Sequence, residues 1–151
     1  MTLQSVMTAL AGVEALVSGL STGRCYDVAP NVVEVSLPAV INVVKGGTLA
    51  RSAGQGLRLT THTILAELLC APPGTDLPTG ETIARPFVSS FISKMDQNRT
   101  LAQTCLDAEV VSYEYGEIKL NSATPGYLGV VFTINATEEE IGNTLFSSTS
   151  T

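Results

Sequence analysis

The side chains best suited to acid–base chemistry are His62, the only histidine, and Glu67, a carboxylate within an apolar run. A histidine changes charge near neutral pH, so it transfers protons in many enzymes. His62 stands within a run of threonines, where we expect a hydrogen-bonded or exposed structural role instead. Glu67 lacks the second carboxylate that two-carboxylate chemistry needs, so we place it at a sheet edge or a subunit interface.

The three cysteines are too far apart to suggest a shared chemical role: Cys25, Cys70 and Cys105. They form no CxxC pair, and no histidine lies near them at the spacing of metal ligands. We therefore expect neither a disulfide framework nor a zinc site, but small buried residues in a reducing compartment. The glycine-rich stretches contain neither GxGxxG nor the phosphate-loop pattern GxxxxGK, so the sequence predicts no nucleotide cofactor.

No combination of these residues forms a catalytic signature, so we predict a protein that is not an enzyme and that holds no cofactor or metal. The alternative, a small cytosolic enzyme, requires His62, Glu67 and one cysteine to converge in a pocket. The acidic run Glu138–Glu140 is interpreted as solvated charge, with cation binding as its alternative.

The size and composition of the chain predict a single domain with a weakly charged surface. A chain of 151 residues with 44% hydrophobic residues can fill one core. Only 15% of the residues are charged, against roughly 25% in most soluble proteins. Such a surface is either ordinary and neutral or partly buried in an assembly.

The net charge of −6 argues against nucleic-acid binding, because that binding depends on Lys and Arg displacing counterions from phosphates. The N-terminus lacks the positive region of a signal peptide, and no apolar run reaches the ~20 residues that span a bilayer. We therefore expect no membrane contact and a protein made in a cytosol.

Two segments have the apolar spacing of amphipathic helices. Residues 2–18 carry one such stripe, which includes Leu16. Residues 82–98 carry the other, with Phe91 at its centre, and we expect this central helix to begin close to Pro86 because proline is disfavoured inside a helix.

The remaining segments predict strands joined by short turns. They are 32–44 with a break at Leu37–Pro38, a hairpin around 54–56 whose second arm is 57–70, then 106–114, 117–120 and 127–135. Gly46–Gly47 and Tyr115–Gly116 have the composition of turns. Since 64–70 is apolar on both faces, we expect that strand at the centre of the sheet. The predicted fold is α+β, a single mainly antiparallel sheet with an N-terminal helix and a central helix packed on it.

The domain is expected to span residues 1–136, followed by a polar C-terminal extension at 137–151. Low complexity predicts disorder of this extension in an isolated molecule. A neighbouring subunit that holds Ile141, Leu145 and Phe146 would order it, since these are its apolar groups.

Charges of opposite sign gather in two places along the chain. Basic residues occupy the predicted hairpin and acidic residues the later strands: Lys45, Arg51 and Arg58; Asp107, Glu109, Glu114 and Glu117. Either these charges are merely solvated, or the basic hairpin of one copy docks on the acidic strands of the next. On the second interpretation the subunit interface includes Lys45, Arg51, Arg58, Glu109, Glu114, Glu117, Leu145 and Phe146.

The order of elements and several segments carry a resemblance to one known family. The segments are LPAVINVVKGG (37–47), LRLTTHTILAELLC (57–70), ARPFVSSFISKMDQN (84–98) followed by RTL (99–101), VVSYEYGEI (110–118) and YLGVVFTIN (127–135). Over roughly residues 1–136 the chain resembles the small tail-terminator proteins of long-tailed bacteriophages, also called tail-completion or neck proteins. The resemblance implies a short α+β subunit that forms a hexameric ring, caps the tail tube and joins it to the head connector.

The resemblance also implies partners and a location. The partners are other copies of the chain, the tail tube protein and the head–tail connector proteins, in a virion tail or neck assembled in the host cytoplasm. DNA would pass through the lumen without specific binding, and negative charge suits a conduit that repels phosphate. Another neck or tail component, such as a head-completion adaptor or a tube subunit, is the alternative of the same type.

Overall fold

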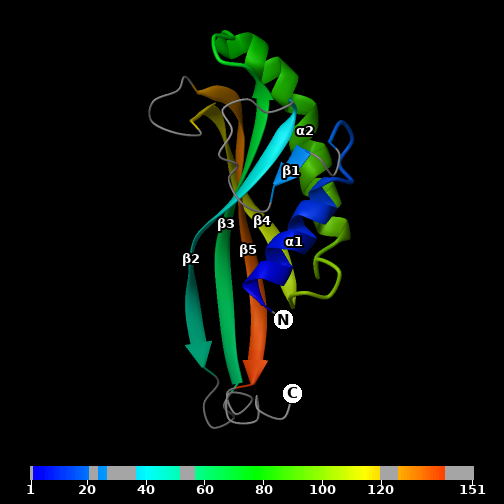
Figure 1. Ribbon diagram of the computed structural model, residues 1–151, viewed down its shortest axis with the longest axis vertical. Coiled ribbons are helices and arrows are strands. Elements are labelled where there is room, and N and C mark those ends of the chain that lie inside the picture. Colours follow the sequence, from blue (N-terminus) through cyan, green and yellow to red (C-terminus); the bar gives the residue numbers. More distant parts are fainter. Residues whose placement is uncertain (1, 21–23, 27–36, 52–56, 120–125, 142–151) are drawn as a thin grey trace.

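The computed structural model describes residues 2–20, 24–26, 37–51, 57–119 and 126–141 (Figure 1). The described elements are α1 (Leu3–Glu14), β1 (Cys25–Tyr26), β2 (Ala39–Arg51), β3 (Leu57–Ala71), α2 (Leu77–Gln97), β4 (Asp107–Ile118) and β5 (Tyr127–Ile141). The strands form one sheet in the order β1-β2-β3-β5-β4, in which only the β1–β2 pair is parallel. The α+β fold, with a mostly antiparallel sheet and two helices, is therefore confirmed.

β3 occupies the centre of the sheet, as its apolar composition predicts. It pairs with β2 on one side and with β5 on the other, from Leu57↔Ile141 to Ala71↔Leu128. Both helices lie against one face of this sheet (Figure 1), where they share a core with Ile64, Ala66 and Leu68 of β3. Since side chains alternate along a strand, the even-numbered residues of β3 face the helices.

Each helix buries its apolar stripe against that face. Thr2 caps α1 by accepting a hydrogen bond from the Ser5 amide, and Asp76 caps α2 in the same way through Thr79. The ring of Phe91 in α2 is fully buried and stacks on Phe132 of β5, with ring centroids 4.0 Å apart. This stack joins the central helix to the middle of the sheet.

The predicted start of the central helix is wrong. α2 begins at Leu77 and continues through Pro86, because the Asp76 cap and Pro78 in the first turn favour an earlier start. A proline inside a helix deprives the carbonyl four residues earlier, here that of Thr82, of its hydrogen bond. Both Pro86 and Thr82 are exposed, so water can bond this carbonyl at the surface. At the other helix, Leu16 is 60% exposed because α1 ends at Glu14.

Two predicted turns lie inside continuous strands. Gly46–Gly47 belongs to β2, which passes through them with an irregularity between Val44 and Gly46. Tyr115–Gly116 belongs to β4, so the strands predicted at 106–114 and 117–120 are one. Long ladders to β3 and β5 override the local turn preference in both cases.

The last strand also extends beyond its predicted end at Asn135, because β5 pairs with β3 as far as Ile141. The first five residues of the predicted extension, 137–141, are therefore part of the sheet. Residues 32–36, the turn at 54–56, and Leu145 and Phe146 lie outside the described residues.

One end of the sheet extends beyond the helices. Residues 45–51 of β2, 57–63 of β3 and 137–141 of β5 continue side by side past the helices, and we call this three-stranded part the arm (Figure 1). Every residue of β2 from Val43 to Arg51 is exposed, whereas Ala39–Asn42 are buried. The arm therefore carries surface that nothing else in the described chain covers.

Candidate interaction surfaces

The outer edge of β2 is one candidate surface. β1 pairs only with Val40 and Ile41, so the rest of β2 has no second strand neighbour among the described residues. Lys45 and Arg51 are exposed along this open edge, as the docking hypothesis requires. Unpaired backbone groups at such an edge can accept another strand.

Arg58 does not belong to this edge. It lies on the central strand β3, where its Cα partners are Arg51 and Glu140, and it is only half-exposed. The proposed basic surface is therefore reduced to Lys45 and Arg51.

β4 is the opposite edge of the same sheet, and it carries the predicted acidic residues. Glu109, Glu114 and Glu117 are all exposed on this strand. Basic and acidic residues that the sequence places in separate segments thus lie at opposite edges of one sheet. Two different patches on one subunit are what a head-to-tail contact between copies needs.

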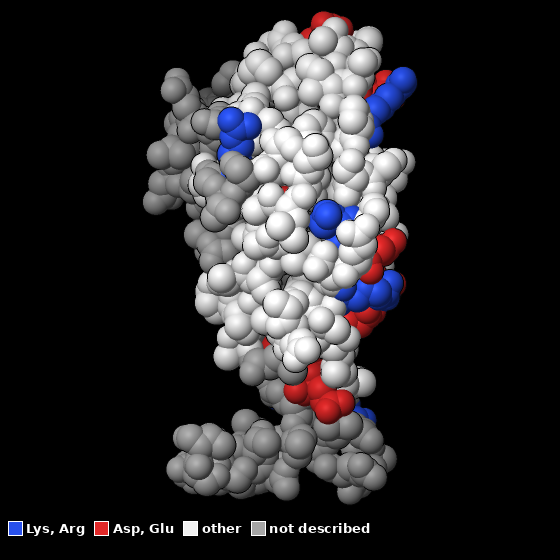
Figure 2. All heavy atoms as spheres, turned by 90° about the vertical axis from the view of Figure 1, so that its right-hand side faces the viewer, with Lys and Arg blue, Asp and Glu red and all other residues white. Residues whose placement is uncertain are grey.

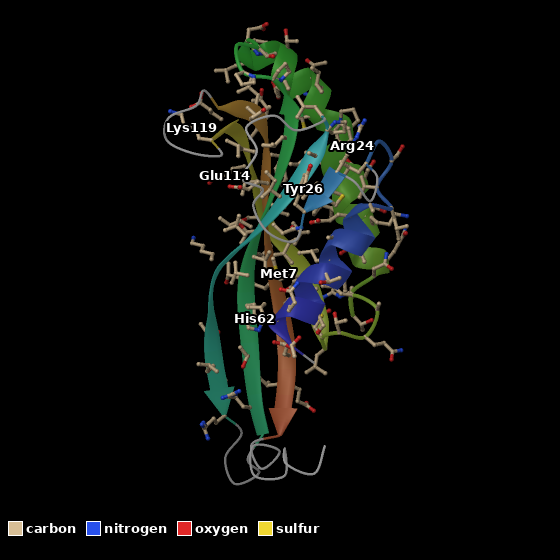
Figure 3. The ribbon with its side chains drawn as sticks, viewed as in Figure 1. Met7, Arg24, Tyr26, His62, Glu114 and Lys119 are labelled. Atoms are coloured by element: carbon tan, nitrogen blue, oxygen red, sulfur yellow. The ribbon has the colours of Figure 1, made fainter. Side chains whose placement is uncertain are left out.

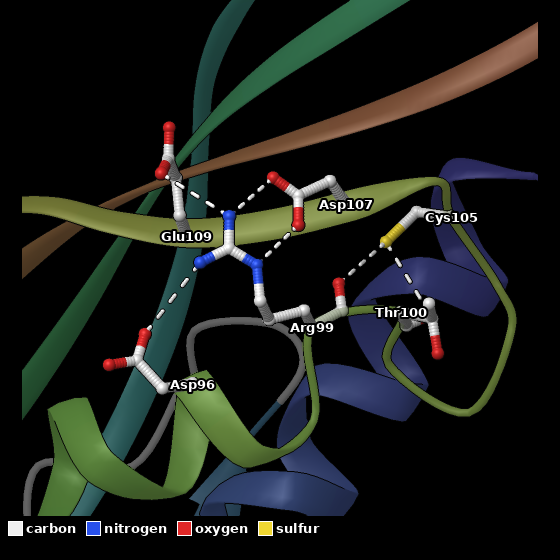
Figure 4. A network of polar contacts seen from close by, with 6 residues as sticks. All are labelled: Asp96, Arg99, Thr100, Cys105, Asp107 and Glu109. Atoms are coloured by element: carbon white, nitrogen blue, oxygen red, sulfur yellow. Dashed lines mark hydrogen bonds and ion pairs between the residues drawn. The ribbon is translucent and has the colours of Figure 1, made fainter.

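Glu109 is partly compensated within its own chain, through Arg99 in the segment between α2 and β4 (Figure 4). The Arg99 guanidinium donates two hydrogen bonds of 2.7 Å to Asp107 and one of 3.4 Å to Glu109, and it lies 3.9 Å from Asp96. The hydrogen bonds from Arg99 lower the pKa of the Asp107 carboxyl. Of the predicted acidic interface residues, this leaves Glu114 and Glu117 without an ion pair to Arg99.

The segment between α2 and β4 also contains a tight turn at Leu101–Gln103. Leu101, Ala102 and Gln103 have φ angles of 47°, 58° and 66°, a left-handed conformation that side chains disfavour. Burial of Leu101 and hydrogen bonds to the Thr100 carbonyl stabilise this turn, one of them from the Cys105 thiol at 3.6 Å (Figure 4). The turn sets where β4 begins, and so where its acidic edge lies.

A groove of about 330 Å³ opens between α2 and β4. Its lining residues are Glu81, Ala84, Arg85, Val88 and Ser89 of α2, Tyr113 and Tyr115 of β4 and Val130 of β5. Tyr115 donates a hydrogen bond of 2.8 Å to the Leu77 carbonyl, which fixes this ring against the start of α2. Glu81 and Arg85 form an exposed ion pair of 3.1 Å on α2. The groove is thus apolar and aromatic inside, with charge on its helical side.

The candidate catalytic residues are not brought together. His62 faces the helix-covered side of β3, where its Nε2 lies 2.6 Å from Glu138 Oε2 and the Glu138 side chain is 5% exposed. Figure 3 shows His62 level with the start of α1. Glu67 lies on the other face, five residues along the strand and so ~16 Å away. Burial raises the pKa of Glu67, while His62 has the hydrogen-bonded structural position expected of it.

The cysteines are free thiols: Cys70 and Cys105 are buried and Cys25 is half-buried. Burial raises their pKa, to about 12 for Cys25 and Cys70 and to about 11 for Cys105. Within the described residues, no three His, Cys, Asp or Glu side chains are grouped so as to hold a metal ion. Among the same residues, neither helix has the length and hydropathy needed to cross a membrane.

A buried carboxyl that the sequence analysis missed lies between α1 and β2. Glu14 is fully buried, and its Oε1 accepts a hydrogen bond of 2.6 Å from Asn42 Nδ2, which also donates to the Tyr26 carbonyl at 3.0 Å. Burial raises the pKa of Glu14 to about 8. The signal was present, because Glu14 follows Met7 and Leu10 at helical spacing and so lies on the apolar face of α1.

Comparison with known proteins adds no identification: no protein-family model matches the sequence, and no curated protein matches it.

Proposed function

We propose that this protein is a structural subunit of a viral tail, a tail terminator whose copies form a closed ring, most simply of six. The observation that carries the proposal is the placement of Lys45 and Arg51 on one edge of the sheet and of Glu114 and Glu117 on the other. A heterologous contact between unlike edges closes into a ring when the rotation between copies permits. The ring size and the viral role rest on the resemblance to tail-terminator proteins.

The charged side chains set register and partner choice in this proposal, while apolar contacts hold the ring together. Exposed ion pairs contribute only about 0–1 kcal/mol each, too little to hold an assembly alone. The few charges on the rest of the surface agree with this division. Figure 2 shows that the helix-covered side is mostly uncharged.

The ring would cap the tail tube and meet the head–tail connector, with DNA passing through its lumen. A head-completion adaptor or a tube subunit would share the edge-to-edge contact and differ in its neighbours. Binding of the purified ring to tube protein and to connector protein, measured separately, distinguishes these roles. A terminator binds both, whereas a tube subunit polymerises without limit.

Native mass measurement of the intact assembly tests the ring itself. We expect a single closed species, and weaker assembly in Arg51→Glu at low protein concentration. Lys94→Glu makes the same charge change in the last turn of α2, on neither edge strand, and is the matched control. A monomer at all concentrations, or equal assembly by both variants, would overturn the proposed use of the β2 edge.

A test of the C-terminal contact needs a truncation beyond the predicted end of the domain. Removal of everything after Asn135 would delete part of β5, including buried Ala136 and Glu138, and would damage the fold. Truncation after Ile141 leaves the sheet intact and removes Leu145 and Phe146. Weaker assembly of this shorter chain would support a role for these two residues in the ring.

A further inference from the structure

The arm carries an apolar side chain that is exposed to solvent. Leu49 is 68% exposed, more than any other large hydrophobic side chain among the described residues. It lies on the β2 edge between Lys45 and Arg51, and its Cα partner is Thr60. Thr60 is two residues from His62, so Leu49 points to the helix-covered side of the sheet.

The α2–β4 groove opens on that same side of the sheet. Tyr113 pairs with Phe132 and Tyr115 with Val130, and both of these β5 residues belong to the core beneath the helices. Among its lining residues Val88 is partly exposed and Tyr113 is 52% exposed, while Ala84 and Val130 are buried. A side chain entering from the neighbouring edge would cover apolar surface of this groove that now faces water.

We propose that Leu49 of one copy inserts into the α2–β4 groove of the next copy. The inference deepens the proposed ring, and so rests on it, by naming the apolar contact that holds unlike edges together. Arg51 follows Leu49 by two residues and projects on the same face, toward the helical side of the groove where Glu81 lies. The exposed Glu81–Arg85 pair contributes little by itself, so sharing Glu81 with Arg51 costs little.

Leu49 cannot fill the groove of its own chain. Leu49 is level with Thr60 of β3, whereas Tyr113 is level with Phe132 and hence with Ala66 of β3. The offset of six residues along the strands is ~20 Å. In addition, β2 and β4 lie at opposite edges of the sheet. Leu49 can therefore enter such a groove only on a second copy.

The same offset restricts how the strands can be oriented relative to the axis of the ring. Each copy contributes four long strands, a width of ~19 Å. A closed ring has no rise from copy to copy, so a 20 Å offset over that width requires strands tilted by roughly 45° to the ring axis, a value that closed sheets reach. An assembly with strands parallel to its axis would overturn the contact.

Cross-linking between copies tests the contact directly. In Leu49→Cys with Ser89→Cys, a short bismaleimide should join neighbouring copies into a ladder of multimers on a denaturing gel. Leu16→Cys with Ser89→Cys is the matched control, since Leu16 is 60% exposed on α1, outside the proposed contact. It also measures any background from half-buried Cys25. An equal ladder in both variants, or none in either, would overturn the proposal.

The energetic test compares Leu49→Glu with Leu16→Glu. Burial of one leucine corresponds to about a 10- to 100-fold change in affinity per contact, so Leu49→Glu should weaken assembly by that factor and Leu16→Glu should not. Both sites are exposed, so both variants should melt near the wild-type temperature. If the Leu49→Glu variant forms the same ring as wild type, this contact would be overturned and the proposed function would stand. A monomeric wild type would overturn both.

Discussion

The helix-covered part of the sheet and the arm are built from the same strands, yet they differ in what lies on them. On the helix-facing side of β3, Ile64, Ala66 and Leu68 are fully buried beneath the helices. Farther along the same side, His62 and Thr60 are only partly buried. β2 changes in the same way, from a buried Ala39–Asn42 to an exposed Val43–Arg51.

This difference indicates that the helix-covered part stabilises the fold and that the arm is available for interaction. Apolar burial stabilises the fold where the helices pack, while the arm is held by strand pairing and by a few polar contacts such as His62–Glu138. Substitutions in the covered part should therefore change the free energy of unfolding, and those on the arm's surface should change the proposed assembly.

The largest loss is expected at Phe91, in the covered part. Phe91→Ala removes a fully buried ring from its stack on Phe132 and leaves a cavity, which should cost about 3–5 kcal/mol of unfolding free energy. Urea denaturation followed by circular dichroism measures the change. Leu49→Ala is the control on the arm and should stay within about 0.5 kcal/mol of wild type. A Phe91→Ala protein as stable as that control would show that α2 does not pack as described.

The next effect is a dependence of stability on pH, caused by Glu14. Its pKa is raised from 4.5 to about 8 in the folded chain, so the folded state holds a proton that the unfolded state has lost between these values. This stabilisation is fully present below pH 4.5 and disappears as pH rises through 8. Across that window wild type should lose ~1.4 kcal/mol per pH unit relative to Glu14→Gln, whose amide does not titrate. Parallel denaturation curves for the two proteins at every pH would contradict the assignment.

The sequence predicts the buried elements better than it predicts the turns. The amphipathic stripes predict both helices, and the apolar run at 64–70 predicts the central strand, because these patterns report burial directly. The turns predicted at Gly46–Gly47 and Tyr115–Gly116 are wrong, since local composition cannot show that a long partner strand will hold the chain extended.

The candidate surfaces show a similar limit. The sequence shows both groups of charges, but not that they lie on opposite edges of one sheet, which depends on strand order. It also gives no sign that Arg99 compensates Glu109, because their contact requires the turn at Leu101–Gln103 to be folded. Burial of Glu14, by contrast, could have been predicted from helical spacing alone.

A smaller loss of stability is expected at His62, at the boundary between the two parts. His62→Ala removes the partner of the buried Glu138 carboxyl, which should cost about 1–3 kcal/mol. The double variant His62→Ala with Glu138→Ala should lose less than the sum of the two single variants, since the partnerless carboxyl is gone. Additive losses would show that the two side chains do not interact. If a folded His62→Ala chain forms the proposed ring as wild type does, the role of the histidine is confined to the fold.

Two adjacent glycines of the arm differ in their surroundings: Gly47 lies against β3, whereas Gly46 faces open space. A Cβ at Gly47 would lie 2.9 Å from the Thr61 carbonyl oxygen and 3.5 Å from His62 Cα, so Gly47→Ala must push β2 from β3 and should cost about 1–3 kcal/mol. A Cβ at Gly46 would meet nothing within 4 Å, and Gly46→Ala should stabilise by about 0.4–1 kcal/mol through lower entropy of the unfolded chain. Thermal melting of the two variants measures the difference. Equal shifts would mean that β2 does not pair closely with β3 here, and the open edge that carries Leu49 would then lie elsewhere.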